Sequence, residues 1–591
     1  WFEPRRAHFF MNNKIMNQEI KKCQNCKKDF TIAPEDFEFY NKIQVPAPTF
    51  CPDCRLQRRF TFRNERTLYR RNCDLCKKSI VSNFSLASER IVYCSPCWWS
   101  DNWDPTDYGQ DYNFEKPFFK QWSELSKVVP VMALAVNYTT MINSDYCHMA
   151  TSLKNCYFVT HANYNEDCFY CSGLIQSKDC GEMLSCDYSE LSLGDVNCSK
   201  CFKIFFSIDC ENCHNIYFSK NLSGCSDCFG CINLRNKKYY IFNKEYSKEE
   251  YFKKLREFDI GSYKKIQEVE KLKSELPMFP QKYMHGRHNN KVTGDYIYNS
   301  KNVKDSYIVK GAEDSKFCQY ITSKPITECY DYTEWGNNAS LIYESVNSGE
   351  GTTNSKFNSQ SWSNCRNIEY TTLCLNVSDI FGCISLLNKQ FYILNKEYSE
   401  TEYKELKDKI IKQMMDMPYK DKTGRVYKYG EFFPAEISPY GYNETTAQEY
   451  FPLSEQEIKK NGYNYVDIDK YKGKYSPTIK ASELPDHIKD ANESIVKEII
   501  ECLECKKAYK LIKQEFDFYK KQNIALPREC SECRYLRRFK QKNFYTLSKQ
   551  KCMCAGLTSD NKIYKNTVEH FHKNEHCPNE FQTTYFKETR F

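Results

Sequence analysis

Several patterns that mark common protein classes are missing from this sequence of 591 residues. It has no run of about 18 apolar residues, the length needed to cross a bilayer, so we expect no membrane association. It begins without the basic, apolar and small-residue regions of a signal peptide. Residues 1–10 precede the first methionine, Met11, and we interpret them as a fragment edge or upstream read-through.

Common catalytic motifs are missing as well. The chain has no Walker A loop, no dinucleotide-binding glycine motif, no His-Glu-x-x-His pair and no Gly-x-Ser-x-Gly elbow. Histidine is scarce, with 10 in the chain and none between Asn289 and Asp486. The usual sequence signs of the main enzyme classes are therefore lacking, and we expect a non-enzymatic protein without a small-molecule substrate.

Cysteine, by contrast, is abundant, with 33 residues. A chain of this length buries sizeable cores without disulfide bonds, so small size does not explain the cysteines. The missing export signal and the odd cysteine count predict a reducing, cytoplasmic location. In that compartment, clustered cysteines bind metal more often than they form disulfides.

The N-terminal cysteines form four Cys-x2-Cys pairs. Each pair offers two sulfurs to one ion, and two such pairs complete a tetrahedral zinc site. With 24 residues between the first two pairs and 17 between the last two, pairing in order predicts two closed sites. The predicted ligands are Cys23, Cys26, Cys51 and Cys54 for the first site, and Cys73, Cys76, Cys94 and Cys97 for the second.

The same module recurs near the C-terminus at an offset of 479 residues. The aromatic stretch at 36–40 and the basic motif at 55–60 recur with it, at 515–519 and 534–539. The repeat predicts a third four-cysteine site, formed by Cys502, Cys505, Cys530 and Cys533.

Beyond this third site the repeated pattern degenerates into a mixed cluster of cysteines and histidines. Zinc accepts imidazole as readily as thiolate, so three cysteines and one histidine could form a fourth site. The alternative is a truncated chain that lacks a further Cys-x2-Cys pair. The candidate ligands are Cys552, Cys554 and Cys577, with His572 taken from the group His570, His572 and His576.

These motifs resemble a known bacterial family. Cys502-x2-Cys505, the Phe-x-Phe-Tyr stretch, Pro527, Cys530-x2-Cys533 and Arg534 resemble the short "probable zinc-ribbon" family, and residues 23–59 resemble it equally. The whole chain is similar to a group of large bacterial zinc-ribbon proteins without an established activity. The resemblance implies zinc binding, and it implies that the final module continues with another Cys-x2-Cys pair.

Arginine is concentrated beside the second cysteine pair of each module. Residues 55–71 carry seven arginines against one glutamate, a net charge of +6. Pro52 and Asp53 favour a helix start, and the arginines that follow have helical spacing. Guanidinium groups match phosphate oxygens, so these zinc-anchored helices predict contact with RNA or DNA, the alternative being an acid-paired or solvated face. The candidate polyanion-binding residues are Arg55, Arg58, Arg59, Arg63, Arg66, Arg534, Arg537 and Arg538.

A short repeat occupies the middle of the chain. All 13 cysteines between Cys147 and Cys231 have residue numbers divisible by three, and rows of 15 residues align most of them in columns. So short a period excludes helical repeats and predicts a narrow β-solenoid, whose thin lumen admits only small side chains. We interpret these cysteines as lumen lining, with metal clusters or disulfides as the alternatives.

The end of this solenoid is itself repeated. The text at 231–247 recurs almost unchanged at 383–399, and both copies continue into a Ser-x-x-Glu capping box that begins a helix. Weaker motifs before the second copy predict a second, less regular solenoid.

The sequence therefore predicts a multi-domain, mainly β protein, in which zinc-ribbon or treble-clef-like modules flank two narrow β-solenoids with short capping helices. The expected cofactor is structural Zn²⁺, three to four ions per chain. The leading hypothesis is a scaffold that binds nucleic acid or a ribonucleoprotein. One alternative is a protein-interaction scaffold that uses the solenoid faces. Another is a zinc hydrolase at the C-terminal cluster.

The predicted boundaries follow the motifs along the chain. They are a fragment edge or disordered segment at 1–19, a tandem zinc module at 20–100, an aromatic linker with a short helix at 101–141, the first solenoid of 15-residue coils with its cap at 142–246, a helical connector at 247–287, the second solenoid and cap at 288–398, a helix at 399–415, an extended connector at 416–495 and the second zinc module, truncated, at 496–591.

Overall fold

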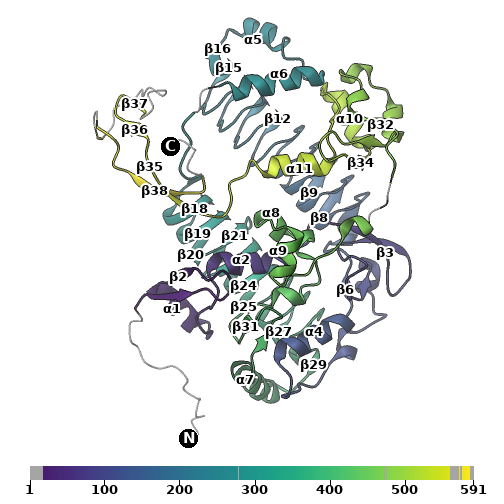
Figure 1. Ribbon diagram of the computed structural model, residues 1–591, viewed down its shortest axis with the longest axis vertical. Helices are drawn as coiled ribbons and strands as arrows, with labels where there is room; N and C mark the ends of the chain where they lie inside the picture. The colour runs from purple at the N-terminus through teal and green to yellow at the C-terminus, as the bar shows by residue number, and fades with distance from the viewer. Residues whose placement is uncertain are drawn as a thin grey trace.

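The computed structural model describes residues 17–276, 279–471, 473, 475–559, 571–572 and 575–585. Most strands are parallel and stack into a long β-solenoid, and cysteine clusters lie near both ends of the chain (Figure 1). The predicted mainly β architecture is confirmed. Most of the predicted fragment edge, residues 1–16, lies outside the described residues.

The first stack of coils is formed by strands that pair in parallel from one coil to the next. The paired residues are 12 apart, as in Ser172 with Leu184 and Phe202 with His214. The predicted 15-residue coil is therefore wrong. The strands of this stack are β7 (Met141–Ile142), β8 (His148–Lys154), β9 (Thr160–Glu166), β10 (Ser172–Ile175), β11 (Leu184–Asp187), β12 (Phe202–Phe205), β13 (His214–Tyr217), β14 (Ser226–Phe229), β15 (Lys238–Ile241) and β16 (Lys244–Glu245).

The 12-residue coil follows from a three-residue side. Residues such as Asn155 and Phe158, with φ of 53° and 52°, adopt the left-handed conformation three positions apart. Each turns the chain at a corner, and four such sides close one coil. Because 12 and 15 are both multiples of three, the inward step visible in the sequence did not distinguish four sides from five.

The lumen of the first stack is lined by buried, free cysteines. Their thiols donate to backbone carbonyls; that of Cys168 lies 3.2 Å from Glu166 O and 3.7 Å from Ser177 O in the next coil. Burial raises the pKa of Cys171 well above its usual value, which keeps the thiol neutral. The interpretation of these cysteines as lumen lining is confirmed.

We expect these lumen thiols to resist alkylation in the native protein. A buried, neutral thiol is a poor nucleophile and is out of reach of a reagent. Mass spectrometry after brief iodoacetamide treatment should find Cys171 and Cys186 unlabelled in buffer and labelled in denaturant. Native labelling at the rate of a free thiol would contradict the packed lumen.

A second stack follows, with less regular coils. Its register steps are 12 residues between Val303 and Ser315, 13 between Tyr330 and Tyr343, and 14 between Lys316 and Tyr330. Its strands are β17 (Gly286–Arg287), β18 (Asn290–Tyr298), β19 (Lys301–Lys310), β20 (Ala312–Lys316), β21 (Gln319–Ile321), β22 (Ile326–Thr327), β23 (Tyr330–Gly336), β24 (Ala339–Gly349), β25 (Thr353–Lys356), β26 (Arg366–Glu369), β27 (Ser378–Phe381), β28 (Gln390–Ile393) and β29 (Lys396–Glu397).

Both stacks end in the same cap. Asn395 accepts from the backbone N–H of Ile384 and donates to its carbonyl, each at 2.8 Å, and Asn243 holds Ile232 in the same way. The last strand of each stack then turns back antiparallel. Capping boxes at Ser247 and Ser399 begin the helices that follow, α5 (Lys248–Leu255) and α7 (Glu400–Asp416).

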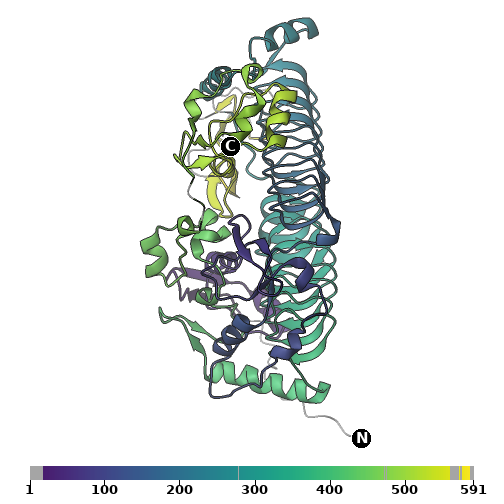
Figure 2. The same ribbon diagram turned by 90° about the vertical axis from the view of Figure 1, so that its right-hand side faces the viewer.

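The two stacks lie against each other in opposite directions. Ion pairs join Asp187 to Lys310 at 2.6 Å and Glu211 to Arg287 at 2.5 Å, so numbers rise along one flank and fall along the other. The coils form a column along one side of the molecule, and the remaining segments cover its other side (Figure 2). The opposite face of the column is left uncovered.

Short elements form the covering layer. In the N-terminal module they are β1 (Glu19–Lys22), β2 (Asp29–Ile32), α1 (Pro34–Lys42), α2 (Pro52–Phe60), β3 (Tyr69–Asn72), β4 (Ser79–Ser82), β5 (Val92–Tyr93), α3 (Ser95–Trp98), and then α4 (Phe118–Val128) and β6 (Val131–Met132). Between the stacks lies α6 (Tyr263–Ser274). The connector holds β30 (Tyr419–Lys420), β31 (Val426–Tyr427), α8 (Thr446–Tyr450), α9 (Glu455–Lys460) and β32 (Ile479–Lys480).

The C-terminal module completes this layer. Its elements are β33 (Ile500–Glu501), β34 (Ala508–Tyr509), α10 (Lys513–Gln522), α11 (Ser531–Phe539), β35 (Ser548–Lys551), β36 (Cys554–Ala555), β37 (Thr558–Ser559) and β38 (Glu580–Thr583). Over the described part of the chain, none of the helices combines the length and the apolar character needed to span a bilayer.

Candidate metal centres

Three groups of four cysteines are brought together as the sequence predicts. In each group the four sulfurs lie within 4.8 Å of one another, an arrangement that could hold a metal ion. The groups are Cys23, Cys26, Cys51 and Cys54; Cys73, Cys76, Cys94 and Cys97; and Cys502, Cys505, Cys530 and Cys533.

The sulfur separations fit a tetrahedral ion. Sγ–Sγ distances are 3.7 Å for Cys26 and Cys51, 3.8 Å for Cys76 and Cys94, and 3.7 Å for Cys505 and Cys530. Zinc–sulfur bonds of about 2.3 Å place tetrahedral sulfurs about 3.8 Å apart. A disulfide would bring them to about 2.05 Å. The residues present therefore fit a closed zinc site of four thiolates.

Backbone geometry prepares each group for negative charge. The first cysteine of each group accepts from the N–H of the third, from Cys51 to Cys23 at 3.3 Å, from Cys94 to Cys73 at 3.3 Å and from Cys530 to Cys502 at 3.2 Å. Burial raises the pKa of Cys73 and Cys502, but these and neighbouring backbone N–H groups outweigh it and lower both to about 7.

The third cysteine of each group also starts a helix. Cys51, Cys94 and Cys530 are the N-cap residues of α2, α3 and α11. Proline follows in the first two, where a missing N–H leaves no hydrogen bond unmade. The helix start predicted at Pro52 is confirmed. An ion in the first or third group would thus fix the start of an arginine-bearing helix.

Neither a family model nor a curated protein matches this chain. The likeness to the zinc-ribbon family therefore stays a prediction, and the metal centres rest on their own geometry.

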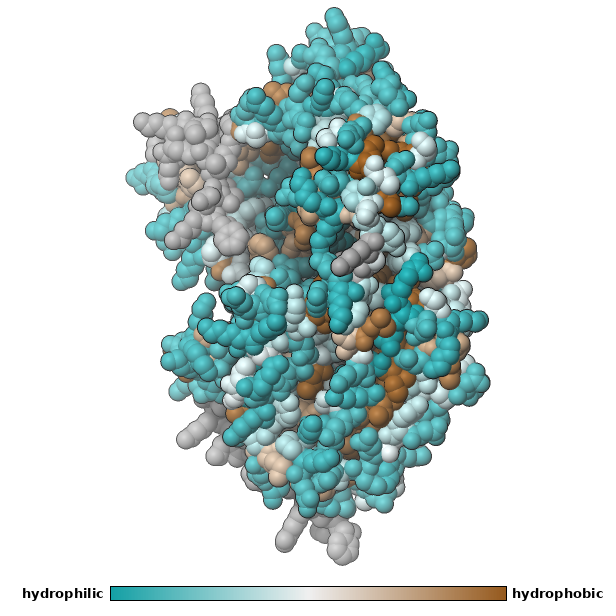
Figure 3. All heavy atoms as spheres, turned by 45° about the vertical axis from the view of Figure 1, so that its right-hand side comes forward, coloured by the Kyte–Doolittle hydropathy of each residue, from teal (hydrophilic) through white to brown (hydrophobic). Residues whose placement is uncertain are grey.

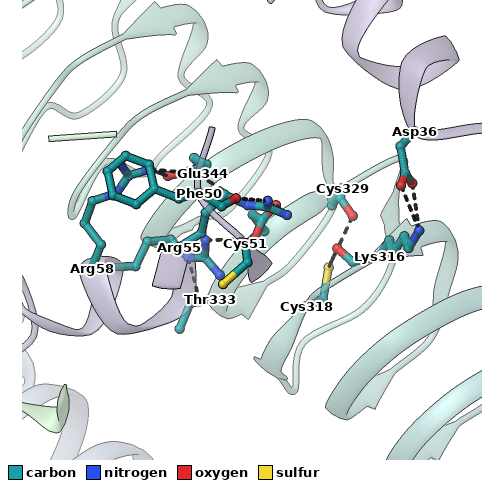
Figure 4. Close-up of polar contacts among 12 residues, drawn as sticks. Asp36, Phe50, Cys51, Arg55, Arg58, Lys316, Cys318, Cys329, Thr333 and Glu344 are labelled. Atoms are coloured by element: carbon teal, nitrogen blue, oxygen red, sulfur yellow. Dashed lines mark hydrogen bonds and ion pairs between the residues drawn. The ribbon is translucent and has the colours of Figure 1, made fainter. Parts of the chain in front are cut away.

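The arginines of α2 are buried, and this corrects the predicted polyanion-binding face. Arg55 and Arg59 both pair with Asp331 of β23, at 2.8 Å and 3.0 Å. Arg58 pairs with Glu344 of β24 at 2.9 Å and with Glu431 at 3.0 Å. Figure 4 shows Arg55 and Arg58 extending from α2 toward the coils of the second stack.

The arginines of α11 are buried in the same way against the first stack. Arg534 lies 3.1 Å from Glu182 and 2.8 Å from Glu515, and Arg538 also pairs with Glu182. By the 479-residue offset, Arg534 and Arg538 correspond to Arg55 and Arg59. The two modules therefore dock alike, each with a pair of arginines around one carboxylate of a coil.

The other candidate arginines are also paired with acids. Arg63 pairs with Glu65 and Glu334, and Arg66 lies 3.1 Å from Glu532. Of the eight candidates, all of which the structure describes, only Arg537 keeps a largely exposed side chain, at 53%. Phosphate cannot reach buried, paired guanidinium groups, so the acid-paired alternative holds for this face.

Sequence reasoning missed the carboxylates that receive these arginines. Glu182 and Asp331 occupy left-handed corners of their coils, with φ of 57° and 52°. The only signal available was an acidic residue at a corner position, and other corners carry acids as well. Pairing each acid with an arginine hundreds of residues away required the three-dimensional fold.

A fourth buried cluster lies where the N-terminal module and both stacks meet. His161 of β9 lies with Nε2 at 2.8 Å from Glu65, and its Nδ1 faces Glu334 of β23. Glu65, His161 and Glu334 are grouped closely enough to hold a metal ion. Their carboxylates, however, face opposite ring nitrogens, so an ion on one nitrogen would reach only one of them. The arrangement fits a protonated imidazole between two carboxylates.

We expect the stability of this junction to fall at alkaline pH. Burial alone lowers the pKa of His161, but Glu334 and Glu65 outweigh it and raise the pKa from 6.5 to about 9. Because the folded value lies above the unfolded one, the stabilisation is complete below pH about 6.5 and is lost as pH rises through 9. The shift corresponds to about 3 kcal/mol.

Urea unfolding at pH 6.5 and pH 10 tests this expectation. His161→Leu should lose most of the difference between the two pH values, whereas the exposed His214→Leu should keep it. Buried Glu449 and Lys542 titrate nearby, each with a pKa shifted by burial to about 8, so the comparison between variants isolates His161. An unchanged pH dependence in His161→Leu would contradict the assignment.

The C-terminal candidates lie together beside β35 and β38. Cys554 and His572 are in contact, as are Cys552 and Cys577. His570 lies outside the described residues.

Proposed function

We propose that this protein is a non-catalytic scaffold in which zinc holds two terminal modules against a β-solenoid. The observation that carries the proposal is the burial of Arg55, Arg59, Arg534 and Arg538 around two coil carboxylates. Each of these arginines lies on a helix that begins at a four-cysteine group. Metal binding and docking are thereby parts of one structural unit.

The zinc ions would act by stabilising structure. A four-thiolate site is closed to substrate, and its binding energy becomes folding energy of the small domain around it. In the first site, Cys51 and Cys54 lie at the start of α2, so an ion there would orient the helix that carries Arg55 and Arg58. Without the ion, these arginines would lose their fixed position over Asp331 and Glu344.

The uncovered face of the coils is the surface that supports binding of a protein partner. On the first stack it carries alternating charges, with Lys154 2.7 Å and Lys178 3.3 Å from Glu166. The view in Figure 3 shows a mostly hydrophilic surface with scattered hydrophobic patches. Repeat proteins commonly bind partners along such regular faces. Nucleic-acid binding stays a prediction, and the buried arginines no longer support it.

Metal analysis of the nuclease-treated chain, followed by limited proteolysis with and without chelator, tests this proposal. We expect at least three zinc ions per chain, and chelation should make α2 and α11 sensitive to protease. A stoichiometric protein partner retained after nuclease treatment would support the scaffold. A metal-free chain with an intact, protease-resistant fold would overturn it.

A further inference from the structure

We infer that Cys552, Cys554, His572 and Cys577 form a fourth metal site, with three thiolates and one imidazole. The inference rests on the proposed scaffold only for the identity of the metal as zinc. Its geometry comes from residues that belong to none of the three four-cysteine groups.

The spacing of these side chains fits a shared ion. Cys554 Sγ and His572 Nε2 are 3.5 Å apart. A tetrahedral zinc with ordinary bond lengths separates a sulfur and a nitrogen ligand by about 3.5 Å. The Cys552 thiol contacts that of Cys577, and the N–H of Cys577 donates to the carbonyl of Cys554 at 2.8 Å. The pairs are thus tied together through the backbone.

The orientation of His572 selects it from the neighbouring histidines. Its Nδ1 lies 2.8 Å from the carbonyl of Glu575, so the proton belongs on Nδ1 and the Nε2 lone pair faces Cys554. Metal-bound histidines commonly use one ring N–H in this way, which fixes both the tautomer and the ring. The ring of His576 instead places Nδ1 3.0 Å from the carbonyl of Cys577.

The site lies where the repeated module requires one. Strand β35 (Ser548–Lys551) follows β3 (Tyr69–Asn72) by the 479-residue offset, and Cys552 corresponds to Cys73. The second ligand departs from the repeat, because Cys76 corresponds to position 555 and the cysteine is Cys554. Strand β35 also pairs with β38, beyond Cys577, whereas β3 pairs with β4.

This arrangement gives the ion a structural role. The segment after β38 contacts the first coils of the second stack, where Thr584 donates to Asp295 at 2.6 Å. Phe581 of β38 packs on Tyr283 with ring centroids 5.0 Å apart. A metal joining Cys552 to Cys577 would therefore secure the strand pair that covers this end of the stack. With four protein ligands the site is closed, which excludes the open position that a hydrolytic zinc needs.

Metal content and cobalt spectra of the full chain test the inference. The wild-type chain should bind four ions, and His572→Ala should bind three or hold the fourth at least tenfold more weakly. His576→Ala is the matched control and should bind four. On Co²⁺ substitution, His572→Cys should restore the fourth ion and replace the three-thiolate, one-imidazole component of the visible spectrum with a four-thiolate one.

Other outcomes separate this inference from the proposed scaffold. Three ions in the wild-type chain, or four tightly bound ions in His572→Ala, would overturn the fourth site and leave the scaffold standing. Loss of the fourth ion in His576→Ala but not in His572→Ala would also overturn it. Absence of metal from Cys502→Ser and wild type alike would count against the scaffold itself.

Discussion

Replacing Asp331 with alanine is expected to lower the free energy of unfolding by about 3–5 kcal/mol. The carboxylate is fully buried and pairs with both Arg55 and Arg59, so its removal leaves two guanidinium groups without a counter-charge inside the protein. An uncompensated buried charge is far more costly than a lost surface ion pair. Denaturant unfolding followed by fluorescence should show the transition at lower concentration.

Two comparisons make this result specific. Glu182→Ala removes the corresponding carboxylate from the first stack and should have an effect of similar size. Arg537→Ala breaks a pair with Glu529 whose arginine side chain is 53% exposed, and it should cost less than about 1 kcal/mol. If Asp331→Ala cost no more than Arg537→Ala, docking through buried arginines would be refuted.

Replacing Cys502 with serine should remove one zinc ion and unfold much of the C-terminal module. Structural zinc sites contribute apparent binding energies of about 10–16 kcal/mol in small domains, and most of that energy is folding energy. Cys502 also accepts the N–H of Cys530, the residue that begins α11. Metal analysis should return one ion fewer, and protease should cut within 496–550.

Cys186→Ser is the matched control for this variant. Cys186 is equally buried, but it lines the lumen, where its thiol donates to the carbonyl of Leu184. The variant should keep the wild-type zinc content, although a buried hydroxyl changes the packing of the coil. Equal zinc content in Cys502→Ser and wild type would mean that the third cysteine group does not hold the metal.

The metal-binding groups were predictable because their determinants are local. Cys-x2-Cys pairs such as Cys23 with Cys26 make a short knuckle, and two knuckles at short separation have few other ways to combine. The helix start at Pro52 and the capping boxes at Ser247 and Ser399 are local as well. Interactions within a few residues of one another leave a pattern in the sequence that can be interpreted directly.

The parts that were wrong or missed depend on residues far apart. A three-residue inward step is compatible with 12 or 15 residues per coil, and only pairing between coils decides between them. The spacing of Arg55, Arg58 and Arg59 indicates one helix face but does not say what covers it. The covering carboxylates, Asp331 and Glu344, belong to a different stack.

The crossed docking of the two modules also orders events during synthesis. Arg55 leaves the ribosome 276 residues before its partner Asp331, and Glu182 leaves 356 residues before Arg538. Contacts between such distant residues form late, after the local units have folded. The N-terminal module therefore waits with its arginines solvated until the second stack exists. The first stack likewise waits for the last module, so the molecule closes only when nearly the whole chain is made.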